Sequence, residues 1–169
     1  YFDNDYSHIA LLNRGNHTFD RINYLNSDFL VDLHSQGLID VDLDGDLDIV
    51  TVEKDGTNQF HCFINNGLND SGGLIFDHAF SYARDDENSS SRTLAISDFD
   101  NDGDQDVYVP RKSGKNWLFV NQTLTYSGSD ITYNENPEPL FIENSISYGI
   151  ADENNMATGS TGYGAAWAD

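Results

Sequence analysis

Short runs of alternating or β-branched apolar residues, separated by Gly, Asn, Asp and Ser, follow one another along most of the chain. Four runs have the length and composition of strands: 34–40 (HSQGLID), 48–53 (DIVTVE), 60–67 (FHCFINNG) and 74–80 (LIFDHAF). A second series in the same order occupies 92–98 (RTLAISD), 106–110 (DVYVP), 116–123 (NWLFVNQT) and 139–145 (PLFIENS). No window has a convincing 3.6-residue period. The pattern predicts an all-β protein.

The two series are copies of one unit of strand, loop, strand, turn, strand, loop and strand. Four short antiparallel strands per unit are typical of a β-propeller blade. We expect a single repeat region over 1–169, with a partial blade at 1–32, blades at 33–91 and 92–161, and the first strand of a further blade at 162–169. The segment 6–19 matches the third strand of the unit, with Asn13 where the others have Asn65 and Asn121. The stretches 81–91 and 122–139 are predicted to be irregular surface insertions.

Each unit carries an acidic loop between its first and second strands. The loops read DVDLDGDLD at 40–48 and DFDNDGDQD at 98–106, with aspartates at positions 1, 3, 5, 7 and 9 and Gly at position 6. So many carboxylates repel one another unless a cation offsets their charge. Side-chain oxygens at positions 1, 3, 5 and 9 and a carbonyl at position 7 form the ligand set that calcium requires, and the Gly permits the sharp turn.

We therefore predict two structural Ca²⁺ sites. The first uses the side chains of Asp40, Asp42, Asp44 and Asp48 and the carbonyl of Asp46. The second uses the side chains of Asp98, Asp100, Asp102 and Asp106 and the carbonyl of Asp104. FDND at 2–5 is at best a degenerate loop, with Asp3 and Asp5 as weak candidates, and Asp169 stands where a further loop would begin.

These motifs resemble the FG-GAP or VCBS repeats of calcium-binding β-propellers, such as those of integrin α-subunit heads. The segments that carry the resemblance are LIDVDLDGDLDIV, ISDFDNDGDQDVYV, NWLFVNQ and GYGAAWAD. Within the family, they most resemble bacterial propellers associated with ASPIC/UnbV-type domains. The resemblance implies a ring of blades that 169 residues do not close. We expect the chain to be a piece of a longer protein; in the alternative, copies join through their blade edges to complete the ring.

Composition narrows the class of protein. The chain has 29 acidic and 8 basic residues and a formal net charge of −21, which argues against nucleic acid or an anionic membrane surface as partner. No stretch resembles a membrane span. Calcium loops of extracellular modules bind with dissociation constants of roughly 0.1–1 mM, which favours an extracellular or cell-surface location. The lone Cys62 lies in an apolar run, as a small core residue does.

Two other interpretations of these residues are less favoured. An EF-hand needs a glutamate at loop position 12, where this chain has Thr51 and Val109, and it needs flanking helices. An enzyme needs paired catalytic groups, yet the histidines (His8, His17, His34, His61 and His78) show no ligand spacing, and we expect no catalysis. Trp117 and Trp167 fit a blade core. N-x-S/T sequons make Asn16, Asn69, Asn88 and Asn121 candidates for glycosylation.

The sequence thus favours an extracellular calcium-binding repeat protein that serves in adhesion or as a scaffold, with self-association through blade edges as one way to assemble. The alternative is a carbohydrate-binding or accessory module of a polysaccharide-processing protein. The ligand, protein or glycan, is not specified by the sequence.

Overall fold

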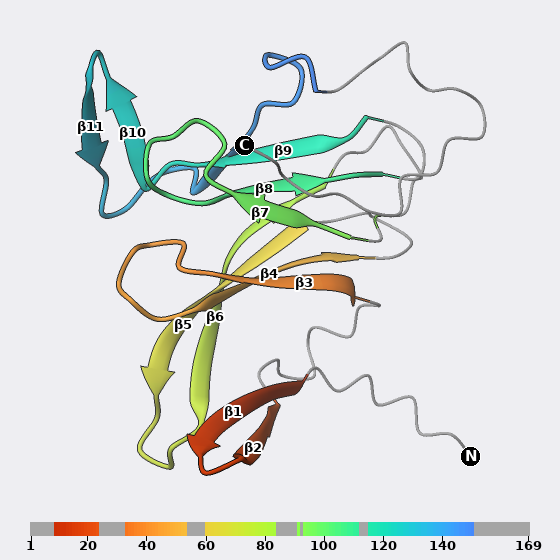
Figure 1. The fold of residues 1–169 in the computed structure, drawn as a ribbon, viewed down its shortest axis with the longest axis vertical. Coiled ribbons are helices and arrows are strands. Elements are labelled where there is room, and N and C mark those ends of the chain that lie inside the picture. The colour runs from red at the N-terminus through yellow and green to blue at the C-terminus, as the bar shows by residue number, and fades with distance from the viewer. Residues whose placement is uncertain are drawn as a thin grey trace.

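The computed structural model describes residues 9–23, 33–53, 60–83, 91, 93–111 and 115–150. Twelve strands and no helix lie within these residues, which confirms the all-β prediction (Figure 1). No helix in this part of the chain has the length and apolar character that a membrane span needs. All strand pairs are antiparallel.

The first four-stranded sheet has the order β3-β4-β5-β6. Its strands are β3 (Leu33–Ile39), β4 (Asp48–Glu53), β5 (Phe60–Leu68) and β6 (Leu74–Tyr82). Every residue of β4 is buried, because the strand lies between two neighbours and both of its faces are covered. β3 and β6 form the edges of this sheet.

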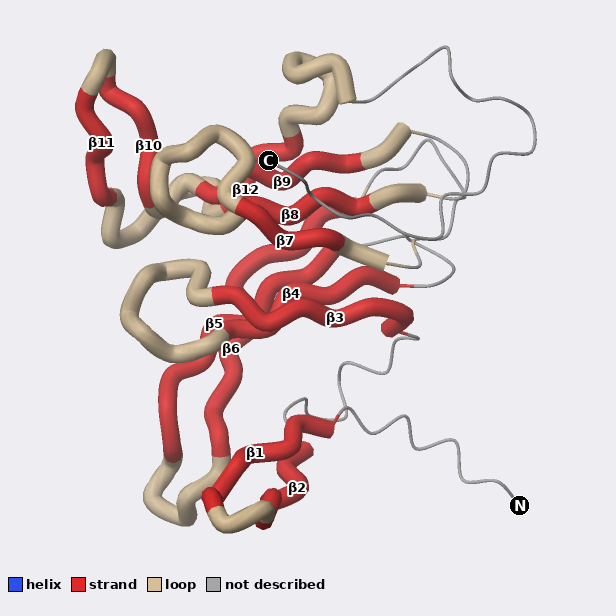
Figure 2. Tube along the Cα trace, in the orientation of Figure 1, coloured by secondary structure: helices blue, strands red, loops and turns tan. Residues whose placement is uncertain are grey.

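The second four-stranded sheet has the order β7-β8-β9-β12. Its strands are β7 (Ala95–Ser97), β8 (Asp106–Val109), β9 (Trp117–Asn121) and β12 (Phe141–Glu143). Each sheet thus follows the predicted unit of four antiparallel strands, although β12 is not the next strand after β9 in the sequence. The two sheets do not close into a ring within the described residues, as expected of an incomplete propeller (Figure 2).

Two hairpins complete the described fold. One pairs β1 (Ile9–Gly15) with β2 (Thr18–Asn23), and the other pairs β10 (Leu124–Ser127) with β11 (Asp130–Tyr133). The prediction that 122–139 is irregular was wrong, since its middle forms the β10–β11 hairpin. The hairpin stands beside the loop between β7 and β8, on the side of the molecule where the β3–β4 loop also lies (Figure 1).

The two four-stranded sheets bury a common core between them. Val50, Val52 and Phe60 of the first sheet belong to the same cluster as Val107 and Phe119 of the second. The rings of Phe60 and Phe119 stack with their centroids 4.1 Å apart. Cys62 is a buried free thiol in this core, as predicted from its apolar run. This packing holds the two acidic loops at fixed places on one side of the molecule.

The two sheets approach each other closely at Gly37, where β3 of the first sheet lies near β7 of the second. A Cβ added at Gly37 on β3 would lie 2.5 Å from Cδ1 of Ile96 on β7 and 2.8 Å from Cδ1 of Leu94. Real Cβ atoms do not approach other carbons so closely, so any side chain at this position would force Ile96 and Leu94 to shift.

Candidate metal centres

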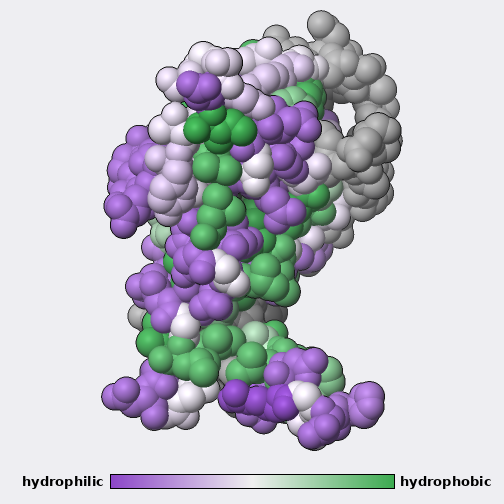
Figure 3. Space-filling view, turned by 60° about the vertical axis from the view of Figure 1, so that its left-hand side comes forward, coloured by the Kyte–Doolittle hydropathy of each residue, from purple (hydrophilic) through white to green (hydrophobic). Residues whose placement is uncertain are grey.

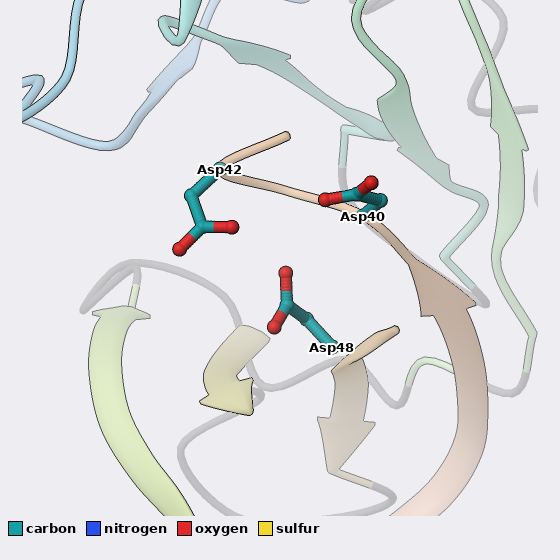
Figure 4. A group of neighbouring side chains, drawn as sticks. All are labelled: Asp40, Asp42 and Asp48. Atoms are coloured by element: carbon teal, nitrogen blue, oxygen red, sulfur yellow. The ribbon is translucent and has the colours of Figure 1, made fainter. Parts of the chain in front are cut away.

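The β3–β4 loop gathers three carboxyl groups around one point. Asp40 and Asp42 are half-buried and Asp48, the first residue of β4, is fully buried. One oxygen from each of the three lies within 4.8 Å of the other two. Figure 4 shows the three side chains pointing toward a shared space from the two ends of the loop. That geometry suits a single ion bound between them.

The β7–β8 loop repeats this arrangement. Oxygens of Asp98, Asp100 and Asp106 lie within 4.8 Å of one another, with Asp106 buried as the first residue of β8. These are the only two such groups of His, Cys, Asp and Glu among the described residues. The aspartates at loop positions 1, 3 and 9 are thus brought together twice.

The backbone of both loops follows the same path. At position 4, Leu43 and Asn101 have φ of 62° and 61°, and at position 6, Gly45 and Gly103 have φ of 96° and 105°. The N–H of each glycine donates to Oδ2 of the first aspartate of its loop, at 3.1 Å in both. A left-handed conformation costs a residue with a Cβ about 1–2 kcal/mol. Both loops contain that unfavourable turn, and in both it wraps the chain around the carboxylates.

The last aspartate of each loop is held by two backbone donors. Oδ2 of Asp48 accepts from the N–H of Val41 at 2.7 Å, and Oδ1 accepts from the N–H of Asn65 at 2.8 Å. In the second loop, Oδ2 of Asp106 accepts from the N–H of Phe99 at 2.6 Å and Oδ1 from the N–H of Asn121 at 2.9 Å. Each carboxylate is therefore oriented by its own loop and by the third strand of its sheet.

Electrostatics in the absence of a cation oppose ionisation of these groups. Burial raises the pKa of Asp48 from 3.8 to about 6 and that of Asp106 from 3.8 to about 7, and the hydrogen bonds from backbone N–H groups only partly offset it. Burial likewise raises the pKa of Asp42 and Asp100, with a smaller contribution from neighbouring carboxylates. A cation at the centre of each group would offset this penalty.

Unsatisfied oxygens provide an independent test of whether an ion fits. Oδ1 of Asp40 and Oδ1 of Asp100 are buried and accept no hydrogen bond from the described residues. A buried polar atom without a partner costs about 1–3 kcal/mol. Because all the possible metal-ligand atoms in each group are carboxylate oxygens, the group suits a hard cation. Each group can therefore hold a metal ion.

The remaining predicted ligands lie outside these groups. Oδ1 of Asp44 accepts from the N–H of Asp46 at 2.8 Å, and Oδ1 of Asp102 accepts from the N–H of Asp104 at 3.1 Å, so both side chains brace the turn. The side chain of Asp46 is exposed, whereas Asp104 is buried and its Oδ2 accepts from the N–H of Leu124. The use of their carbonyls as ligands stays a prediction. Asp3, Asp5 and Asp169 lie outside the described residues.

The sequons occupy different environments. Asn16, in the β1–β2 turn, and Asn69, in the β5–β6 turn, are exposed. Asn121 has no exposed surface and its side-chain amide donates to the carbonyl of Val41 at 2.9 Å, so a glycan has no access to it in the folded chain. Asn88 lies outside the described residues.

The sequence did not predict the buried pair of Glu53 and His61. Nε2 of His61 lies 3.1 Å from Oε1 of Glu53, and Nδ1 lies 3.2 Å from Nε2 of His78. Burial lowers the pKa of His61, and Glu53 only partly offsets this. The signal that would have found the pair is strand register, because β4 and β5 pair Thr51 with His61 and so bring this end of the hairpin together. His8 and Trp167 lie outside the described residues, and Trp117 is a buried core residue as predicted.

Fold and loops together define a class of protein, namely an all-β repeat protein in which each four-stranded sheet has, between its first two strands, an acidic loop that could hold a metal ion. Comparison with known families agrees, since residues 40–109 match the FG-GAP-like repeat family. The match covers this part of the chain and bears out its resemblance to FG-GAP repeats. Neither curated proteins nor solved structures yielded a match.

Proposed function

We propose that this chain is a non-catalytic, extracellular repeat module whose two acidic loops bind Ca²⁺ to stabilise the sheets that follow them. The observation that carries the proposal is the duplication of one site. Two loops with different intervening residues share the same three-carboxylate group, the same left-handed positions and the same pair of backbone donors to the last aspartate.

Calcium is favoured among hard cations by the number and flexibility of the available oxygens. Ca²⁺ takes six to eight oxygen ligands in irregular geometry, whereas Mg²⁺ requires a near-ideal octahedron and retains several waters. Each loop offers three converging carboxylates, and a carbonyl of Asp46 or Asp104 with water would complete the coordination. When bound, the ion supplies positive charge at the centre of the loop.

A cation bound to either loop would stabilise the sheet that follows, through the last aspartate of the loop. Asp48 begins β4 and Asp106 begins β8, so ordering either carboxylate orders the start of a buried strand. Through the N–H groups of Asn65 and Asn121, the same carboxylates also fix the third strand of each sheet. A cation that binds only the folded state stabilises it by mass action.

The absence of catalysis is supported by the environment of the most conspicuous histidine. Both ring nitrogens of His61 lie within hydrogen-bond distance of neighbouring side chains, and the residue is 2% exposed. A general base must reach the proton it removes, and a buried, fully engaged imidazole is poorly placed for this.

An adhesion or scaffold role is supported by exposed apolar surface. Leu11, Phe19, Leu68 and Ile75 are all more than a third exposed. Hydrophobic residues gather near the lower end of the molecule, around the β1–β2 hairpin and the turn between β5 and β6 (Figure 3). Contiguous exposed apolar surface commonly marks a site of protein association.

The carbohydrate-binding alternative has one specific observation in its favour. Tyr126 and Tyr133 of the β10–β11 hairpin are 50% and 54% exposed and stand beside the metal loops. Aromatic rings with an apolar face and a polar tip are suited to stacking on sugars. A glycan array probed with and without calcium, together with sedimentation velocity under the same conditions, separates the two roles: glycan binding favours this alternative and self-association favours the scaffold.

Thermal unfolding with and without calcium tests the metal function. We expect 10 mM CaCl₂ to raise the Tm of the parent over that in EDTA, and we expect 10 mM MgCl₂ to have a smaller effect. The Asp40→Ala variant should lose part of this rise, whereas Asp77→Ala, an exposed aspartate on β6, should keep all of it. A parent Tm that is the same in calcium and EDTA would contradict the proposal.

A further inference from the structure

Three hydrogen bonds, connected through the residues Asn121 and Val41, join the last aspartates of the two acidic loops. Asn121 donates from its backbone N–H to Oδ1 of Asp106 at 2.9 Å and from its side-chain amide to the carbonyl of Val41, also at 2.9 Å. Val41 in turn donates from its N–H to Oδ2 of Asp48 at 2.7 Å. Asp106 and Asp48 each belong to one of the three-carboxylate groups, so the path runs from one group to the other.

This path is buried and reinforced. Val41 and Asn121 have no exposed surface and Thr123 is 1% exposed. The hydroxyl of Thr123 donates to the same carbonyl of Val41 at 2.8 Å. Hydrogen bonds in a low-dielectric interior are electrostatically stronger than in water and polarise one another. A displacement of Asp106 is therefore transmitted to Val41 rather than absorbed by solvent.

The β10–β11 hairpin makes a second link between the loops. The hydroxyl of Tyr126 donates to the carbonyl of Asn101 in the second loop at 2.6 Å, and that of Tyr133 to the carbonyl of Asp42 in the first loop at 3.4 Å. The pairing of Leu124 with Tyr133 and of Tyr126 with Ile131 places both tyrosines on one face of the hairpin. The same hairpin thus contacts both loops.

The equivalent asparagine of the first sheet provides a natural contrast. Asn65 donates from its N–H to Oδ1 of Asp48 at 2.8 Å, just as Asn121 does to Asp106. Its side-chain amide, however, donates to the carbonyl of Leu47 at 3.2 Å, within the same loop. The two residues therefore share their role inside a site, and only the side chain of Asn121 reaches the other loop.

We propose that the two loops bind cations cooperatively and that Asn121 is the positioning residue that couples them. This inference rests on the proposed function. Asn121, fixed by Asp106 when the second loop holds an ion, would hold the carbonyl of Val41. The N–H of the same Val41 would then orient Asp48 for an ion in the first loop. Coupling between binding sites is reciprocal, so calcium in the first loop strengthens the second site by the same factor.

Isothermal titration with CaCl₂ tests the coupling in the full chain. Asp40→Ala disables the first loop and Asp98→Ala the second. We compare the dissociation constant of each intact loop in these variants with that of the same loop in the parent. With Asn121 present, we expect the ratio of the two dissociation constants to be about 5 or more, because the other loop no longer contributes. With Asn121→Ala added, we expect this ratio to fall toward one, whereas Asn65→Ala, the matched control, should preserve it.

The outcomes separate the inference from the function on which it rests. Two calcium ions bound with independent affinities, and a ratio near one in the parent, would overturn the coupling and leave the metal function standing. No calcium binding to the parent would overturn both. If Asn121→Ala does not fold by circular dichroism, Asn121→Ser takes its place, because its hydroxyl can still accept from the N–H of Thr123 but is too short to reach the carbonyl of Val41. An unchanged ratio in that variant would overturn the inference.

Discussion

Replacement of Asp106 by asparagine should affect stability differently with and without calcium. Asn has nearly the shape of the carboxyl group but carries no charge. The pKa of Asp106 is raised by burial from 3.8 to about 7. At 1.36 kcal/mol per pH unit, the ionised group thus costs the cation-free folded state about 4 kcal/mol at pH 8 relative to a neutral one.

The substitution removes that penalty but spoils one hydrogen bond. Both oxygens of Asp106 accept from backbone N–H groups, those of Phe99 and Asn121, and the amide of asparagine must oppose one of these donors with its own NH₂. A buried donor left without an acceptor costs about 1–3 kcal/mol. In EDTA at pH 8 we therefore expect Asp106→Asn to be at least as stable as the parent.

In calcium the variant should lose this advantage in part or in whole. If the second loop binds with a dissociation constant of roughly 0.1–1 mM, 10 mM calcium stabilises the parent by about 1.4–2.7 kcal/mol through that loop, and the variant loses this contribution. Urea unfolding at pH 8 in EDTA and in calcium measures both differences. Asp77→Asn, an exposed aspartate on β6, serves as the control and should behave alike in both. Equal destabilisation of Asp106→Asn in the two conditions would refute the reasoning.

Three further predictions concern protons and packing. Because the pKa of Asp48 is raised to about 6, the cation-free folded state keeps a proton on this group that the unfolded chain has released above pH 3.8. The stability that this proton contributes to the folded state is lost as the pH rises through 6. Calcium binding near pH 6 should release the proton, which is measured as a binding enthalpy that depends on the buffer. Gly37→Val should destabilise by about 1–3 kcal/mol in urea, because its Cβ would meet Ile96 at 2.5 Å, and an unchanged midpoint would contradict the close packing of the sheets. Phe60→Ala should cost about 3–5 kcal/mol by calorimetry, whereas the exposed Phe19→Ala should cost little, and similar losses would contradict the shared core.

Local features of the fold were predictable because they are encoded within a few residues. The strands follow the apolar runs, and the chemistry of each loop is contained in nine consecutive positions. The positive φ at Gly45 and Gly103 was implied by their place in the motif. Such features need only steric and electrostatic rules that act along the chain, and both acidic loops lie, as predicted, between the first two strands of their sheets.

The β10–β11 hairpin was not predictable in the same way. Its segment has turn residues, yet its tyrosines are half exposed and an isolated two-stranded hairpin is marginal in water. What holds it against the loops includes hydrogen bonds from Tyr126 and Tyr133 to residues 25 and 91 positions away in sequence. Those partners become neighbours only after the sheets have packed.

The sequence by itself determined that the chain forms short antiparallel strands and that two of its turns concentrate carboxylates, because hydrophobic alternation and the spacing of the aspartates are local properties. Only the tertiary structure decided how the two turns are related. Asn121 and Val41 are 80 residues apart, and the burial that strengthens their hydrogen bond exists only where the sheets enclose it. A link of this kind depends on packing between sheets, to which no short stretch of residues is a guide.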